Sequence, residues 1–75
     1  MEVIYDIHSD YWRSIYRRLF DNQGVTSNRL DRLELERRLL ANESIVILKD
    51  PDGRWLAVKI PSQEDAVRLK LMYGE

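Results

Sequence analysis

Apolar and polar positions follow a strand-like period of two in some parts of the chain and a helical period in others. Every second residue of segment 2–7 is apolar from Val3 onward, which predicts a strand with one buried side. Segments 44–49 and 54–60 are rich in valine, isoleucine and leucine and are separated by a short polar stretch. They predict two further strands that form a β-hairpin.

Three other segments carry apolar residues at the spacing of a helix. The first spans residues 10–21 after Ser9, which is a good N-cap, and the second spans residues 27–41. The third begins at Ser62 in the sequence "SQED", which matches a capping box, and continues to about Tyr73. The order of elements is therefore βααββα. We predict an α+β domain in which a small antiparallel sheet, made of the N-terminal strand and the hairpin, packs with three helices.

The turn of the hairpin is strongly encoded. Asp50, Pro51, Asp52 and Gly53 are the residues that a type I turn followed by a G1 bulge prefers at these positions. With this turn Asp50 opposes Arg54, and counting back predicts the following cross-strand pairs and faces. Leu48 pairs with Leu56 and Val46 with Val58 on one face, which continues to Ile60, and the opposite face holds Ile45, Ile47, Trp55 and Ala57, flanked by Lys49 and Lys59.

Both faces of the predicted hairpin are apolar, and two of the predicted helices likewise carry apolar residues on two sides. In the second helix Leu33 and Leu40 fall nearly opposite Leu35 and Leu39. In the third helix Ala66, Leu69 and Tyr73 share one side, whereas Val67 and Leu71 share another. An apolar patch left exposed on a small domain usually marks an interface. We therefore expect the chain to form a homodimer.

Composition limits the classes of function. At 75 residues the chain is a single domain, residues 1–75, and it contains no cysteine for disulfides or thiolate chemistry. The formal net charge is -1, so any affinity for nucleic acid must come from a local patch. No apolar run approaches the length of a membrane span, and the acidic N-terminus is unlike a signal peptide. We expect a cytoplasmic protein with no membrane partner.

No catalytic or metal-binding pattern is present. His8 is the only histidine, and a capping or strand-end role suits it better than general-base chemistry or zinc binding. Asp50 and Asp52 lack the further oxygen ligands of a calcium loop and are expected to be turn residues. We expect no enzyme activity, no cofactor and no metal.

The nine arginines suggest a second class of function. Some of them gather on the polar side of the first helix, and others lie near the start of the second helix, where side chains can reach bases in a major groove. The alternative hypothesis is binding of duplex DNA. Its candidate residues are Arg13, Arg17, Arg18, Asn28, Arg29, Arg32 and Arg54.

The segment "RLELERRLLANESIVILKDPDGRWLAVKIPSQEDAVRLK" resembles the recognition helix and wing of winged helix-turn-helix domains in small transcription regulators. The resemblance covers about half of the chain, residues 33–70. It implies that Asn28, Arg29 and Arg32 belong to a recognition helix and that Arg54 lies at the tip of a wing. Residues 21–28 are too short for the additional helix that precedes the recognition helix in that family.

Between the two functions we favour a small regulatory module that binds a protein, because an aromatic residue in an apolar sheet patch suits a binding hot spot. Such a chain has the size of an inhibitor or regulator made by a mobile element. The predicted interface residues are Ile45, Ile47, Trp55, Ala57, Leu35 and Leu39, and burial of Trp55 in the core is the alternative for that residue.

Overall fold

The computed structural model describes residues 1–24 and 32–74 of the chain, and its element order is the predicted βααββα. The elements are β1 (Val3–Asp6), α1 (Asp10–Asn22), α2 (Arg32–Glu43), β2 (Val46–Lys49), β3 (Trp55–Ile60) and α3 (Gln63–Tyr73). The N-terminal part of the predicted second helix, residues 27–31, lies outside the described residues. The other helix boundaries agree with the prediction to within two residues.

Two helices begin at the predicted serine caps. The Ser9 side chain accepts a hydrogen bond from the main-chain nitrogen of Trp12 at 3.2 Å. Ser62 accepts one from the main-chain nitrogen of Asp65 at 3.1 Å and also contacts the Asp65 carboxylate. Each cap satisfies a nitrogen that the first helical turn leaves without a partner. Both helix starts are therefore set by local sequence.

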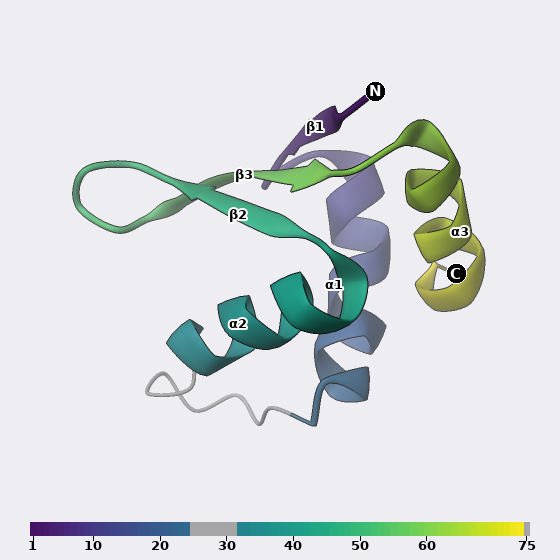
Figure 1. The fold of residues 1–75 in the computed structure, drawn as a ribbon, viewed down its shortest axis with the longest axis horizontal. Helices are drawn as coiled ribbons and strands as arrows, with labels where there is room; N and C mark the ends of the chain where they lie inside the picture. The colour runs from purple at the N-terminus through teal and green to yellow at the C-terminus, as the bar shows by residue number, and fades with distance from the viewer. Residues whose placement is uncertain (25–31, 75) are drawn as a thin grey trace.

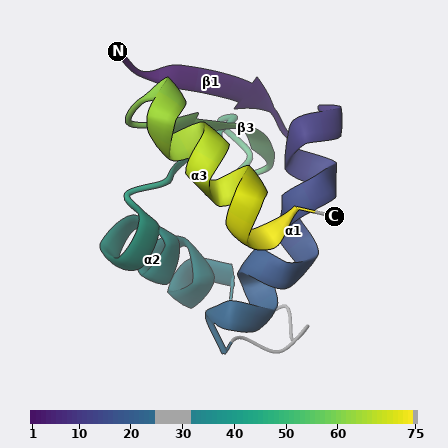
Figure 2. The same ribbon diagram turned by 90° about the vertical axis from the view of Figure 1, so that its right-hand side faces the viewer.

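The three strands form one antiparallel sheet in the order β1-β3-β2, so the last strand of the hairpin is central. All three helices lie on one side of this sheet (Figures 1 and 2). β1 alternates as predicted, with half-buried Val3 and Tyr5 toward the helices and exposed Ile4 and Asp6 on the other side. No described element covers that other side of the sheet.

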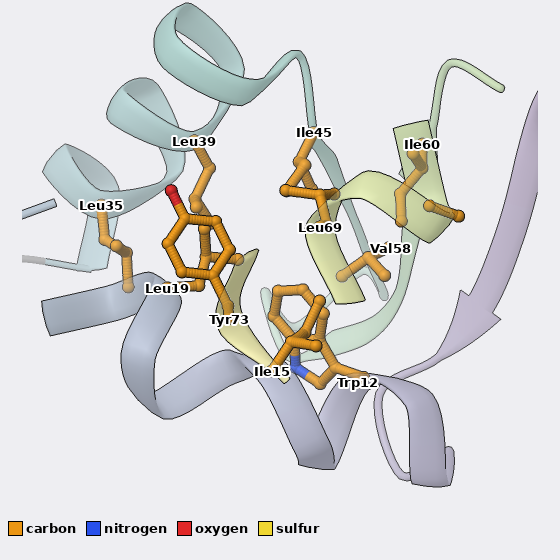
Figure 3. Close-up of a cluster of buried hydrophobic side chains, with 11 residues drawn as sticks. Trp12, Ile15, Leu19, Leu35, Leu39, Ile45, Val58, Ile60, Leu69 and Tyr73 are labelled. Carbon is orange, nitrogen blue, oxygen red and sulfur yellow. The ribbon is translucent and has the colours of Figure 1, made fainter. Parts of the chain in front are cut away.

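The hydrophobic core lies between the sheet and the helices, and each helix contributes to it (Figure 3). Its large, fully buried side chains come from α1, α2, α3 and the hairpin with its entry: Ile15, Leu19, Leu39, Ile45, Val58, Ile60 and Leu69. Burial of this apolar surface is the main force that holds so small a domain together. No described helix has the length and apolar character needed to cross a membrane.

The hairpin turn is as predicted. The Gly53 nitrogen donates to the Asp50 carbonyl at 2.9 Å, Gly53 has φ +85°, and the Asp50 nitrogen donates to the Arg54 carbonyl at 2.9 Å. The Asp50 carboxylate also accepts hydrogen bonds from the nitrogens of Asp52 and Arg54 at 2.9 and 2.8 Å. These contacts confirm that Asp50 and Asp52 are turn residues.

The predicted register beyond the turn is wrong, because a second irregularity follows. Lys49 pairs with Trp55, but the next residue, Leu48, pairs with Ala57, which leaves Leu56 as an extra residue in β3. A bulge of this kind changes which residues share a face of the sheet. Trp55 therefore packs toward the core together with Val58 and Ile60, which had been assigned to the opposite face, whereas Ala57 and Lys59 face away from the helices.

Candidate functional site

The most distinctive surface feature is a row of aromatic rings that runs from the core to the outside. Phe20 packs edge-on against buried Trp12, with ring centres 6.0 Å apart, and against half-buried Tyr16 at 5.6 Å. Trp55 of β3 closes the row, because its ring stands at 89° to that of Phe20 with centres 6.1 Å apart. Edge-to-face pairs at these distances are favourable and fix the orientation of both rings.

An arginine covers the end of this row. The Arg32 guanidinium carbon, at the start of α2, lies 5.6 Å from the centre of the Trp55 ring. A cation at this distance over an indole is attracted by its π electrons. The Arg32 side chain is exposed and Trp55 is half-buried, so a partner that approaches this surface meets both groups.

Two more arginines belong to the same surface by helix geometry. Residues three and four apart on a helix are neighbours, so Arg13 lies beside Tyr16 and Arg17 lies beside Phe20. Both arginines are exposed. We call this surface the aromatic–arginine patch; it consists of Tyr16, Phe20 and Trp55 with Arg13, Arg17 and Arg32.

Three of the six predicted interface residues lie in the interior. Leu39 and Ile45 are completely buried and Leu35 is almost so, which makes them part of the hydrophobic core. Their assignment to an interface was wrong, because α2 turns its Leu35 and Leu39 side into the hydrophobic core. The opposite side of α2, with Leu33 and Leu40, is the exposed one.

The remaining three predicted residues do not form one surface. Ile47 and Trp55 pack against the core from the helix side of the sheet, and both are half-buried. Ala57 lies on the uncovered side because of the bulge at Leu56. Of the predicted interface, Trp55 alone belongs to the aromatic–arginine patch.

The arginines of the DNA hypothesis are divided among several places. Arg13, Arg17 and Arg18 are exposed on α1, and Arg54 is exposed next to the hairpin turn. Arg18 lies on the flank of α1 that faces α3, since Ser14, one turn before it, accepts a hydrogen bond from Lys70 at 2.5 Å. Asn28 and Arg29 lie outside the described residues.

Polar groups between the helices serve the fold. The Tyr73 hydroxyl donates to Glu43 at 3.1 Å and accepts from Asn22 at 3.0 Å, which joins α1, α2 and α3. Burial, followed by the charge of Glu43, raises the pKa of Tyr73. The Tyr11 hydroxyl donates to the Ala66 carbonyl at 2.6 Å, and burial raises the pKa of Tyr11 to about 12. These tyrosines are thereby held in their neutral form.

The contacts of His8 and the arrangement of the acidic residues indicate structural roles. The His8 main-chain nitrogen donates to the Asp6 carboxylate at 2.7 Å, and the His8 side chain is exposed. Within residues 1–24 and 32–74, no three side chains of the histidine, cysteine, aspartate or glutamate type gather as a metal site would require.

Sequence reasoning missed Phe20, which contacts Trp55, and Tyr16, which contacts Phe20. The two residues are four apart on α1, a spacing that places them on one flank of the helix. The contact of Phe20 with Trp55, which is 35 residues further along the chain, depends on tertiary packing of α1 against β3 and has no local signal.

No family model, curated protein or solved structure matches the chain, so its function is argued from the geometry of this surface.

Proposed function

We propose that the chain is a small non-enzymatic regulatory module that binds a partner protein through the aromatic–arginine patch. The observation that carries the proposal is the position of Trp55. Its ring is held between Phe20 and Arg32 and remains partly accessible. Tryptophan, tyrosine and arginine are the residue types that dominate binding energy at protein interfaces.

The aromatic rings of the patch are held in place before a partner arrives. The edge-on contacts join its rings to Trp12 in the core, so little side-chain freedom remains to be lost on binding. The lost freedom of a rotamer-rich side chain costs about 0.5–1.5 kcal/mol. The rings of the patch are already ordered and avoid this cost.

The charges of the patch indicate what the partner offers. Three arginines surround three rings, so a segment with an apolar or aromatic anchor flanked by carboxylates complements it. Asp10 and Asp21 lie one helical turn from Arg13 and Arg17 on α1 and weaken the positive field there. This favours a protein over the regular row of phosphates in duplex DNA.

Selection from a displayed library of random peptides, followed by titration of purified peptides, tests the proposal. We expect selected peptides to combine acidic and apolar residues and to change tryptophan fluorescence on binding. Tyr16→Ala and Arg32→Ala should each weaken binding about tenfold or more. Leu71→Ala, at an 80% exposed position on α3, is the matched control and should leave binding unchanged.

Trp55→Ala should abolish peptide binding while circular dichroism still shows the folded domain. Duplex DNA provides the opposing result. The DNA hypothesis would replace this proposal if the chain bound duplex DNA with an affinity that falls steeply with salt. In that case Arg17→Ala and Arg32→Ala would both weaken DNA binding, and Trp55→Ala would leave it unchanged.

A further inference from the structure

The two edges of the sheet are protected very differently. β1 carries acidic residues at both ends, since Glu2 precedes it and Asp6 closes it. β2 has the sequence Val-Ile-Leu-Lys, and its one charged residue, Lys49, lies at its end. Charges on an edge strand normally prevent pairing with another chain. The β2 edge lacks this protection along its apolar part.

The charge of Lys49 does not protect that edge either, because it is engaged in an ion pair. Its ammonium group forms an ion pair with the carboxylate of Glu36 on α2, at 3.0 Å. The Glu36 side chain is largely covered. The single charge of β2 is therefore engaged with the helix beneath the sheet.

An apolar groove runs beside the same edge. It has a volume of about 300 Å³ and lies between α2 and β2, which run alongside each other in Figure 1. α2 lines it with Leu33, Arg37 and Leu40, which are spaced to share one side of the helix, and the hairpin lines it with Val46 and Ile47. Leu33 is 61% exposed and Leu40 is 56% exposed.

We infer that a second copy of the chain occupies this side of the molecule, with β2 pairing antiparallel to its symmetry mate. Such pairing joins two three-stranded sheets into one, and the unpaired backbone groups of both β2 edges are satisfied together. The twofold axis also brings the exposed side of α2 against the same side of the other α2. Leu33 and Leu40 of each copy then fill the groove of its partner.

The charges around the groove favour a second copy over an unrelated chain. The charged residues that line it are Glu36, Arg37 and Lys49. Lys49 pairs with Glu36 at 3.0 Å, and Arg37 lies 3.9 Å from Glu34, which also pairs with Arg38 at 3.2 Å, so each of these charges has a partner within its own protomer. A rim with so little unpaired charge repels its own copy only weakly and offers little attraction to a strongly charged partner.

The area required is compatible with weak association. A specific interface at the lower end of the usual range buries about 600 Å² per partner, which is about one-ninth of the 5416 Å² surface of the chain. One side of a domain that measures 31 × 26 × 22 Å can supply this area. We expect a dissociation constant on the order of micromolar.

The inference does not depend on the aromatic–arginine patch, and charge-swap variants test it. One variant combines Leu33→Glu with Leu40→Glu, and the other combines Leu33→Lys with Leu40→Lys. Each alone should associate at least about tenfold more weakly than the wild type, because like charges meet across the axis. An equimolar mixture should recover a 1:1 dimer. Leu71→Glu on α3 is the control and should dimerise like the wild type.

Sedimentation measures the mass across concentration, and circular dichroism checks the fold of each variant. The wild type should rise from 9.0 kDa toward twice that mass. A cysteine-free chain offers a second readout: Arg37→Cys, midway between the two leucines, should form an interchain disulfide on oxidation, whereas Leu71→Cys should not.

Two results would overturn the inference. One is a wild-type chain that stays at 9.0 kDa up to about 1 mM, far above a micromolar constant. The other is a dimer that persists in both charge-swap variants and is lost in Ile4→Lys, at a 60% exposed position on the uncovered side of the sheet. That pattern would place the contact on the sheet face instead of the β2 edge.

Discussion

Replacement of Gly53 by valine isolates the backbone contribution of the hairpin turn. Gly53 has φ +85°, a conformation that residues with a side chain adopt at a cost of about 1–2 kcal/mol. A Cβ atom at this position would meet no other atom within 4 Å, so no steric clash adds to that cost. The stiffer unfolded chain of the variant returns about 0.4–1 kcal/mol. Because a β-branched residue resists this conformation most, we expect a net loss of about 1 kcal/mol or more.

The loss is measurable because the domain is small. At roughly 0.05–0.15 kcal/mol per residue, 75 residues correspond to a free energy of unfolding of about 4–11 kcal/mol. In a domain of this size each kcal/mol lowers the melting temperature by about 4–8 °C. Thermal unfolding followed by circular dichroism, together with urea titration, gives the change in free energy directly.

Gly53→Asn is the matched control, because asparagine tolerates positive φ better than other residues with a side chain. It should lose clearly less stability than Gly53→Val, although both add atoms to the same open space. A valine variant that melts at the wild-type temperature would refute the assignment of strain to this turn. Equal losses for asparagine and valine would show that the cost is not conformational.

Three further predictions concern the interior. Leu39→Ala, at a fully buried position, should destabilise the fold by about 2–5 kcal/mol in urea titration, whereas Leu71→Ala, at an exposed one, should stay within about 0.5 kcal/mol. Ser62→Ala removes the cap of α3 and should cost about 1 kcal/mol, and a loss near zero would contradict the capping role. Tyr11 has a pKa of about 12 against 10 unfolded, so its neutral form is preferred in the fold. The resulting contribution to the free energy of unfolding is fully present below pH 10 and is lost as the pH rises through 12. Replacement of Tyr11 by phenylalanine should therefore reduce the fall in stability over that interval. An identical pH profile for the Tyr11→Phe variant would contradict it.

The elements themselves could be predicted because their signals are local. Ser9 and Ser62 each lie next to the nitrogen they cap, and the hairpin turn is determined by four consecutive residues. The element order and the antiparallel sheet follow from these signals and from apolar periodicity. The strand order β1-β3-β2 does not follow from these signals, because the N-terminal strand could pair with either edge of the hairpin.

The candidate surfaces depended on tertiary structure. The sequence pattern correctly predicted that α2 and α3 have apolar residues on two sides, but it could not tell which side of α2 enters the core, since Leu33 and Leu40 are as apolar as Leu35 and Leu39. Leu35 and Leu39 are buried because they join the core side chains of α1, β3 and α3.

The bulge at Leu56 is the clearest case of a feature that local sequence did not reveal. The residues from Trp55 to Val58 are all apolar, so either register gives two apolar faces, and hydrophobic alternation does not choose between them. Packing against the helices makes the choice, because the adopted register buries Val58 and Ile60 and also brings Trp55 to Phe20. The sequence by itself determined the turn, the caps and the order of elements, which rest on contacts between near neighbours. The tertiary structure decided which apolar side chains are buried and which remain exposed, because that depends on contacts between distant segments.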